Sequence, residues 1–258
     1  MAAYVAVMVG VSLLRNAVNS GFINRRYATV IENALEGDFN SDRMLGVIGF
    51  NNDLLNGLRE FIKSNAKGCC AELGTLIALS SSIGGSLDVE FFYTDTKTTW
   101  LSALALSNCL SECGIIQGVN VIGSTQVPLF GGGDLDEGLA SLVNVVGRKL
   151  ASRISRGDDA YVAFTGGTKI EAVLVSMVAW LIGARPIYLM ERGPLIVLPM
   201  LPVNLNGGVV NALCSAIKGS INANDAEGLI KLGLINATKD GYRVPKWVDA
   251  LLKVKGLC

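Results

Sequence analysis

Two short motifs combine residue types that bind anions. The first, FTGGTK, places Gly166, Gly167, Thr168 and Lys169 directly after an apolar run. Paired glycines let backbone amides approach a ligand closely, and the lysine adds a mobile cation. A Walker A loop has Ser or Thr after its lysine and a longer glycine spacing, so the motif argues against ATP hydrolysis. We interpret it as an anion site centred on Lys169, with a purely structural turn as the alternative.

The second motif, VGVSLLRN, follows the first apolar run of the chain. Ser12 supplies an uncharged hydroxyl donor, and Arg15 follows on the next turn of the predicted helix. A single serine at this position more often serves only as a helix N-cap. The motif lacks the GxGxxG pattern of a dinucleotide-binding loop, which argues against a dehydrogenase. Ser12 is a candidate site residue, and Arg15 is a weaker candidate for binding phosphate.

The elements that position these motifs are strands and helices in alternation. Six apolar runs are typical of strands buried in a parallel sheet; they span 4–11, 87–93, 118–123, 160–165, 186–190 and 195–198. Helical patterns span 12–19, 98–113, 135–154 and 169–182, and a glycine-rich loop is expected over 129–138. This alternation predicts an α/β, doubly wound, mostly parallel Rossmann-like sheet. Ligands of such sheets bind beyond the carboxyl ends of the strands, where both motifs lie.

Two regions depart from the alternation. Residues 24–82 have an all-helical pattern and interrupt the first crossover, so this insertion either covers the sheet or forms a dimer contact. The composition changes at about Gly207, after which two short helices, a hairpin and a last helix resemble a small winged-helix unit. We therefore predict a Rossmann-like domain over 1–206 and a winged-helix-like C-terminal domain over 207–258.

Charge and hydropathy limit the partners. The 258 residues are half hydrophobic, with 22 basic and 22 acidic side chains, so no global field draws the chain to DNA or to an anionic membrane. No signal-peptide pattern is present, and the apolar runs fall short of the roughly 20 residues of a membrane span. We predict a cytoplasmic protein without membrane contact. We do not expect DNA binding, because the tail has seven basic against four acidic residues, a small excess.

Six cysteines and no histidine decide little about metals or redox state. No cysteine pair has CxxC spacing, and a mixed Cys/His zinc site is impossible without histidine. Cys109 and Cys113 lie one helical turn apart and are predicted to be core thiols. An intracellular disulfide remains open, as in some thermophiles. We predict no metal and no cofactor.

The hydroxyl residue after the first strand and the Gly-Gly-Thr-Lys turn after the fourth resemble the motifs of a CARF domain, the CRISPR-associated Rossmann fold that senses cyclic oligoadenylates. The resemblance extends over about 1–203, and many members carry a winged-helix-like tail. Members divide into effectors, regulators and ring nucleases. Effectors usually carry a HEPN ribonuclease site that needs a histidine, which this chain lacks. The chain looks most like a standalone ring nuclease, which opens cyclic tetra-adenylate and ends type III CRISPR signalling.

The resemblance implies metal-independent cleavage to linear products with 2′,3′-cyclic phosphate ends. Lys169 would stabilise the developing negative charge, and Ser12 would hold the reacting ribose or phosphate. The amides of Gly167 and Thr168 would bind the oxyanion, with Arg15 as a phosphate ligand. A ring of four equivalent nucleotides contains a two-fold axis, which predicts a homodimer that shares the ligand.

Two other functions remain open. One is a transcription regulator that binds cyclic oligoadenylate without cleaving it and reads DNA with its tail. The other is a small-molecule Rossmann enzyme that uses Lys169 as a general base.

Overall fold

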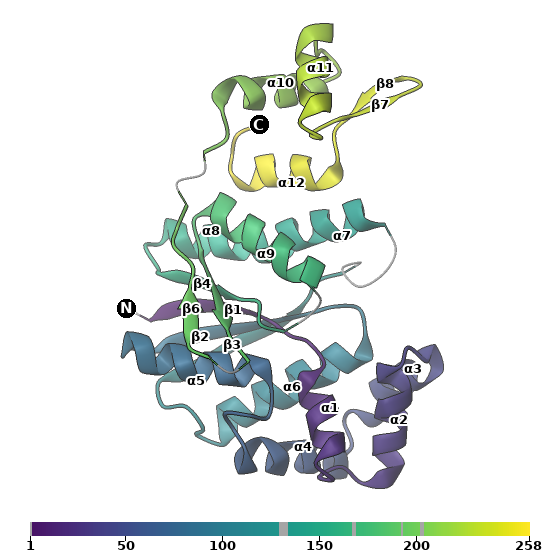
Figure 1. Ribbon diagram of the computed structural model, residues 1–258, viewed down its shortest axis with the longest axis vertical. Coiled ribbons are helices and arrows are strands. Elements are labelled where there is room, and N and C mark those ends of the chain that lie inside the picture. The colour runs from purple at the N-terminus through teal and green to yellow at the C-terminus, as the bar shows by residue number, and fades with distance from the viewer. Residues whose placement is uncertain (1, 129–133, 167–168, 192, 202–203) are drawn as a thin grey trace.

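A six-stranded sheet with helices on both faces forms the centre of the molecule (Figure 1). The computed structural model describes residues 2–128, 134–166, 169–191, 193–201 and 204–258. The strand order is β3-β2-β1-β4-β5-β6; all neighbours are parallel except β6, which is antiparallel to β5. The strands are β1 (Ala3–Met8), β2 (Leu87–Tyr93), β3 (Val119–Gln126), β4 (Ala160–Ala163), β5 (Arg185–Leu189) and β6 (Leu195–Val197). This confirms the predicted α/β, doubly wound, mostly parallel Rossmann-like sheet.

Strand β1 shows why the sheet is covered on both faces. Every residue of β1 is buried, and successive side chains of a strand point to opposite faces. Val5 and Val7 belong to the core beneath one face, and Tyr4 and Met8 belong to the core above the other. The continuous apolar run that predicted this strand therefore reflects two hydrophobic cores that share one strand.

Helices cover the two faces in separate groups (Figure 1). The lower group holds α1 (Ser12–Asn19), α2 (Arg25–Leu35), α3 (Phe39–Ile48), α4 (Asn52–Ser64), α5 (Ala71–Ile83) and α6 (Lys97–Glu112). The upper group holds α7 (Leu135–Leu142), the π-helical turn η1 (Val143–Gly147), α8 (Arg148–Ser155) and α9 (Lys169–Ile182). The loop predicted over 129–138 is shorter than expected, because α7 begins at Leu135; its residues 129–133 lie outside the described chain.

The helical insertion consists of α2 to α5, and part of it covers the sheet. Helix α5 packs against β5 and β6, so this part of the insertion covers the sheet, which is one of the two roles predicted for it. Helix α3 is joined to the main fold by Asp42, whose carboxylate accepts hydrogen bonds from the amides of Lys97 (2.9 Å) and Thr98 (3.0 Å). These amides are unpaired donors in the first turn of α6, so Asp42 caps a helix from a distant segment. A dimer contact through the insertion stays a prediction.

The tail has the predicted elements in the predicted order. They are α10 (Gly207–Ile217), α11 (Ala223–Lys231), the hairpin β7 (Asn236–Thr238) with β8 (Gly241–Arg243), and α12 (Lys246–Val254). A disulfide joins Cys214 of α10 to Cys258, which fastens the end of the chain to this unit. The position of the domain boundary stays a prediction.

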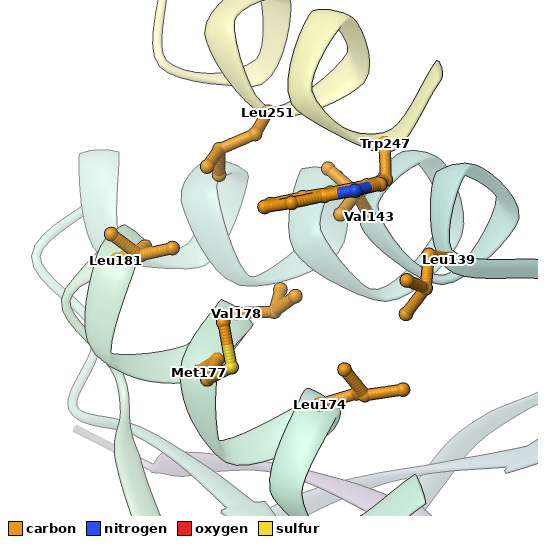
Figure 2. Close-up of a pocket in the computed structure, with 8 residues that line it drawn as sticks. All are labelled: Leu139, Val143, Leu174, Met177, Val178, Leu181, Trp247 and Leu251. Atoms are coloured by element: carbon orange, nitrogen blue, oxygen red, sulfur yellow. The ribbon is translucent and has the colours of Figure 1, made fainter. Parts of the chain in front are cut away.

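Helix α12 attaches the tail to the upper helices. Trp247 and Leu251 point from α12 toward Val143 and Val178, around a small apolar cavity of about 30 Å³ (Figure 2). The amide of Trp247 also donates to the carboxylate of Asp136 on α7 (3.2 Å). Leu251 belongs to the same core as the upper face of the sheet. The last helix therefore completes the core of the main fold.

No helix in the described part of the chain combines the length and the apolar character needed to cross a membrane.

Candidate functional site

The carboxyl ends of β1 and β4 lie side by side at the centre of the sheet. The chain continues from β1 into α1 on the lower face and from β4 toward α9 on the upper face (Figure 1). The strand order reverses between these two strands, and this switch point is where open α/β sheets bind ligands. Both motifs of the sequence analysis follow these two strand ends.

Ser12 is the first residue of α1, and it is not the N-cap. The N-cap position belongs to Val11, which makes no side-chain cap. The Ser12 hydroxyl instead donates to Glu72 Oε2 (3.1 Å), and its oxygen accepts the amide of Ala71 (3.4 Å). The N-cap interpretation of Ser12 is therefore wrong, because the hydroxyl is engaged by α5, about sixty residues further along the chain.

Glu72 is the centre of this arrangement and was not identified from the sequence. The residue is 2% exposed, and its Oε1 accepts the amide of Gly10 at 2.6 Å. The residue lies in the first turn of α5, where the helix dipole favours a negative charge. The sequence signal was available: Glu72 is the only charged residue in the apolar stretch CCAELGTLIAL.

Gly166 lies against the same carboxylate from the β4 side. A Cβ atom at Gly166 would overlap Glu72 Oε1 and would lie 3.1 Å from both Glu72 Cδ and Gly10 N. The position therefore accepts only glycine without a shift of its neighbours. The first glycine of the predicted anion motif and the serine of the other motif thus meet on one buried side chain.

A chain of hydroxyl groups holds the start of the FTGGTK loop. Thr75 donates to the carbonyl of Ala71 (2.7 Å), so its oxygen is left to accept from Thr165, 2.9 Å away. Thr165 in turn accepts the amide of Leu189 (3.1 Å). The loop is thereby fixed to α5 on one side and to β5 on the other.

The remaining predicted site residues are described only in part. Helix α9 begins at Lys169, so its N-terminus faces the same edge of the sheet, and amides at a helix N-terminus favour anions. The predictions for Gly167, Thr168 and the Lys169 side chain lie outside the described residues. Arg15 is exposed on α1, and within the described chain its side chain makes no hydrogen bond or ion pair.

A second polar feature, a cavity of about 340 Å³ beside α8, lies away from this edge. Its lining includes Glu90, Lys149 and Arg153. Glu90 is 3% exposed and accepts hydrogen bonds from Tyr4 (3.0 Å) and Thr125 (2.9 Å), with Lys149 at 3.2 Å. Burial, and then the Glu90 charge, raise the pKa of Tyr4, so the phenol stays a donor. The carboxylate is satisfied within the fold, which indicates a structural network.

Fold and switch point together define a doubly wound α/β protein with a candidate anion site at the carboxyl edge of its sheet. Residues 67–201, just over half of the chain, match the model of the family described as CRISPR-associated protein (Cas_APE2256). The chain therefore belongs to this CRISPR-associated family. The matched segment includes Glu72 and the FTGGTK motif and begins after Ser12.

Proposed function

We propose that this protein is a metal-independent ring nuclease that binds cyclic tetra-adenylate and opens it, which switches off type III CRISPR signalling. The observation that carries the proposal is the meeting of Ser12 and Gly166 on the buried carboxylate of Glu72 at the switch point. Membership of a CRISPR-associated family supports the biological setting. The resemblance of the two motifs to those of CARF domains supports the ligand.

The proposed reaction is an intramolecular transesterification. The 2′-oxygen of one ribose attacks the adjacent phosphorus, the bond from phosphorus to the 5′-oxygen breaks, and the proton of the 2′-hydroxyl ends on the 5′-oxygen. The products carry 2′,3′-cyclic phosphate ends, and no water is consumed. Since nucleophile and phosphate are already neighbours in the ring, the enzyme has to rotate the ribose into line and stabilise charge.

Each predicted residue has a role in this reaction. Lys169 would stabilise the negative charge that grows on the phosphate or on the leaving oxygen. The amides of Gly167 and Thr168 would donate to the phosphate oxygens, and Arg15 would bind a neighbouring phosphate. These roles rest on the motif resemblance.

The contact with Glu72 refines the role of Ser12. Because the Ser12 hydroxyl donates to Glu72, its proton is directed away from a ligand. Its oxygen accepts the amide of Ala71 with one lone pair and keeps the second free to accept from a ligand. We therefore assign Ser12 as an acceptor for the ribose 2′-hydroxyl, which would turn the 2′-oxygen toward phosphorus. Glu72 would act as a positioning residue that holds the Ser12 hydroxyl in this orientation.

A homodimer follows from the ligand. A ring with a two-fold axis would contact the same loops of two copies, so one chain would supply half of the site.

A transcription regulator that binds cyclic oligoadenylate without cleaving it is the second candidate function, and helix α11 argues against it. The exposed face of α11 carries Asp225 and Glu227, and its one basic residue, Lys231, is paired with Glu227 at 2.7 Å. A helix that reads DNA presents unpaired basic and amide side chains instead.

Incubating the pure protein with labelled cyclic tetra-adenylate in EDTA tests the proposal. Cleavage to products with cyclic phosphate ends is expected, and Lys169→Ala should abolish most of it. Lys218→Ala, which removes an exposed lysine from the tail, is the matched control and should cleave like the wild type. Binding without cleavage would instead favour the regulator. Neither binding nor cleavage would favour a small-molecule enzyme.

A further inference from the structure

Two of the free cysteines are placed for a reaction with each other. The sulfur atoms of Cys109, in the last turn of α6, and Cys113, its C-cap, lie 2.7 Å apart. A disulfide bond is about 2.05 Å long, so the sulfurs have to approach by about 0.7 Å and the Cβ atoms have to draw closer as well. We propose that Cys109 and Cys113 form a dithiol that a hydroperoxide oxidises to an intramolecular disulfide.

The backbone at this position can accommodate the bond. Helical rise and radius place Cα atoms four residues apart at about 6.2 Å, within the range found for disulfides. The Cβ atoms four residues apart in a regular helix are separated by about 5–6 Å, which is about 1–2 Å more than in a disulfide, so the last turn has to tighten. Cys113 already lies at the helix end, and Gly114 after it has a φ of 61°, so the adjustment falls where the helix stops.

The surroundings assign different roles to the two thiols. Cys113 is partly exposed and lies near Arg59, whose guanidinium is paired with Glu112 at 2.9 Å; the proximity of Cys113 is the main cause that raises the pKa of Arg59. A neighbouring cation stabilises a thiolate, which is the reactive form. Cys109 is buried, and burial, followed by the contact with Cys113, raises its pKa to about 12. Hydrogen peroxide reaches the partly exposed Cys113 before the buried Cys109, so Cys113 is the attacking sulfur and Cys109 is the resolving thiol.

The reaction balances with hydrogen peroxide as oxidant. The Cys113 thiolate attacks one peroxide oxygen, the O–O bond breaks, hydroxide leaves and a sulfenic acid forms. The Cys109 sulfur then attacks the Cys113 sulfur, the S–O bond breaks, and water leaves with the thiol proton. Two electrons pass from the two sulfurs to the peroxide. A small dithiol reverses the reaction by exchange.

The other cysteines are not suited to this reaction. Cys69 and Cys70 are both buried, with sulfurs 3.8 Å apart, and the Cys70 sulfur caps α5 by accepting the amide of Leu73. A bond between these sequence neighbours would remove that cap. Cys214 and Cys258 are already joined. Nowhere in the described ranges do three or more Cys, Asp or Glu side chains converge as a metal site would require.

Peptide mapping of the whole protein tests the proposal. Native protein is treated with hydrogen peroxide, denatured, alkylated and digested with a protease that cuts after glutamate. Glu112 lies between the two cysteines, so the fragments 91–112 and 113–137 separate unless a disulfide joins them. We expect the joined pair after peroxide and its loss after dithiothreitol, with Cys69 and Cys70 alkylated in both samples. Alkylation of all four free cysteines after peroxide, or a bond between Cys69 and Cys70 instead, would overturn the proposal.

Two sets of variants test the roles. In Cys109→Ser we expect a sulfenic acid on Cys113 that dimedone traps, whereas Cys113→Ser should yield no trapped product. Arg59→Leu should slow the oxidation at least about threefold, and Arg59→Lys, which keeps the cation, should react nearly like the wild type. A dimedone adduct in Cys113→Ser and none in Cys109→Ser would refute the assignment of Cys113 as the attacking sulfur, and oxidation of Arg59→Leu at the wild-type rate would refute the contribution of Arg59. The wild-type digest decides the proposal even if a variant fails to fold.

Discussion

Replacing Glu72 tests whether one buried carboxylate holds the two halves of the candidate site together. Glu72→Ala removes the acceptor for the buried amide of Gly10 and for the hydroxyl of Ser12. Glu72→Gln keeps the size of the side chain and one oxygen. The pair of variants separates the loss of contacts from the loss of charge.

The expected magnitude follows from these contacts. A hydrogen bond to a charged group contributes about 1.5–3 kcal/mol, and an unpaired buried donor costs about 1–3 kcal/mol. Glu72→Ala leaves the Gly10 amide unpaired and opens a cavity, while the Ser12 hydroxyl can rotate to another partner. We expect the free energy of unfolding to fall by about 3–5 kcal/mol. In Glu72→Gln the amide oxygen still accepts from Gly10, so the expected loss is about 1 kcal/mol.

Urea denaturation with a fitted slope measures these differences. Glu32→Ala, which removes an exposed carboxylate from the middle of α2, is the matched control and should change stability by no more than about 0.5 kcal/mol. If Glu72→Ala unfolds within about 1 kcal/mol of the wild type at an unchanged slope, Glu72 does not hold the two loops together.

Cleavage kinetics of Glu72→Gln test the positioning role. The amide group of the glutamine would donate to Ser12, whose oxygen already accepts from Ala71, so its second lone pair would no longer be free for a ligand. The single-turnover rate with cyclic tetra-adenylate should fall about 10- to 100-fold, with little change in ligand binding. A wild-type rate in this folded variant would mean that the contact between Ser12 and Glu72 is structural alone.

Three further predictions concern the site, the assembly and the tail. Lys169→Ala should lower the single-turnover rate in EDTA about 10²-fold or more and weaken binding far less, since only interactions that strengthen in the transition state accelerate chemistry; equal losses in both would assign Lys169 to binding. Gly166→Ala should destabilise the fold by about 1–3 kcal/mol in a thermal or urea melt, because the added Cβ overlaps the Glu72 carboxylate; an unchanged melt would contradict the packing described here. Light scattering at micromolar concentration should report a dimer, and a monomer that added ligand does not change would contradict the shared site. The protein should not bind promoter duplexes tightly; salt-sensitive binding that is lost on truncation at Gly207 would instead support the transcription regulator.

Local patterns in the sequence determined the elements. The predicted helices over 12–19 and 169–182 have the same bounds as α1 and α9, and all six predicted strands are present. Apolar periodicity, glycine turns and polar helix starts act over a few residues, so they can be read without knowledge of the fold. The doubly wound arrangement followed from their alternation, and with it the expectation that both motifs lie at one edge of the sheet.

Only the tertiary structure decided what the motif residues contact. The N-cap role considered for Ser12 was wrong because its hydroxyl is taken up by Glu72, which no local pattern connects to it. The steric need for Gly166, the pairing of Cys214 with Cys258, and the packing of α12 on the upper helices likewise join segments far apart in the chain. Such contacts depend on which buried polar groups and apolar faces come together when the chain folds, and the spacing of residues along the sequence does not predict them.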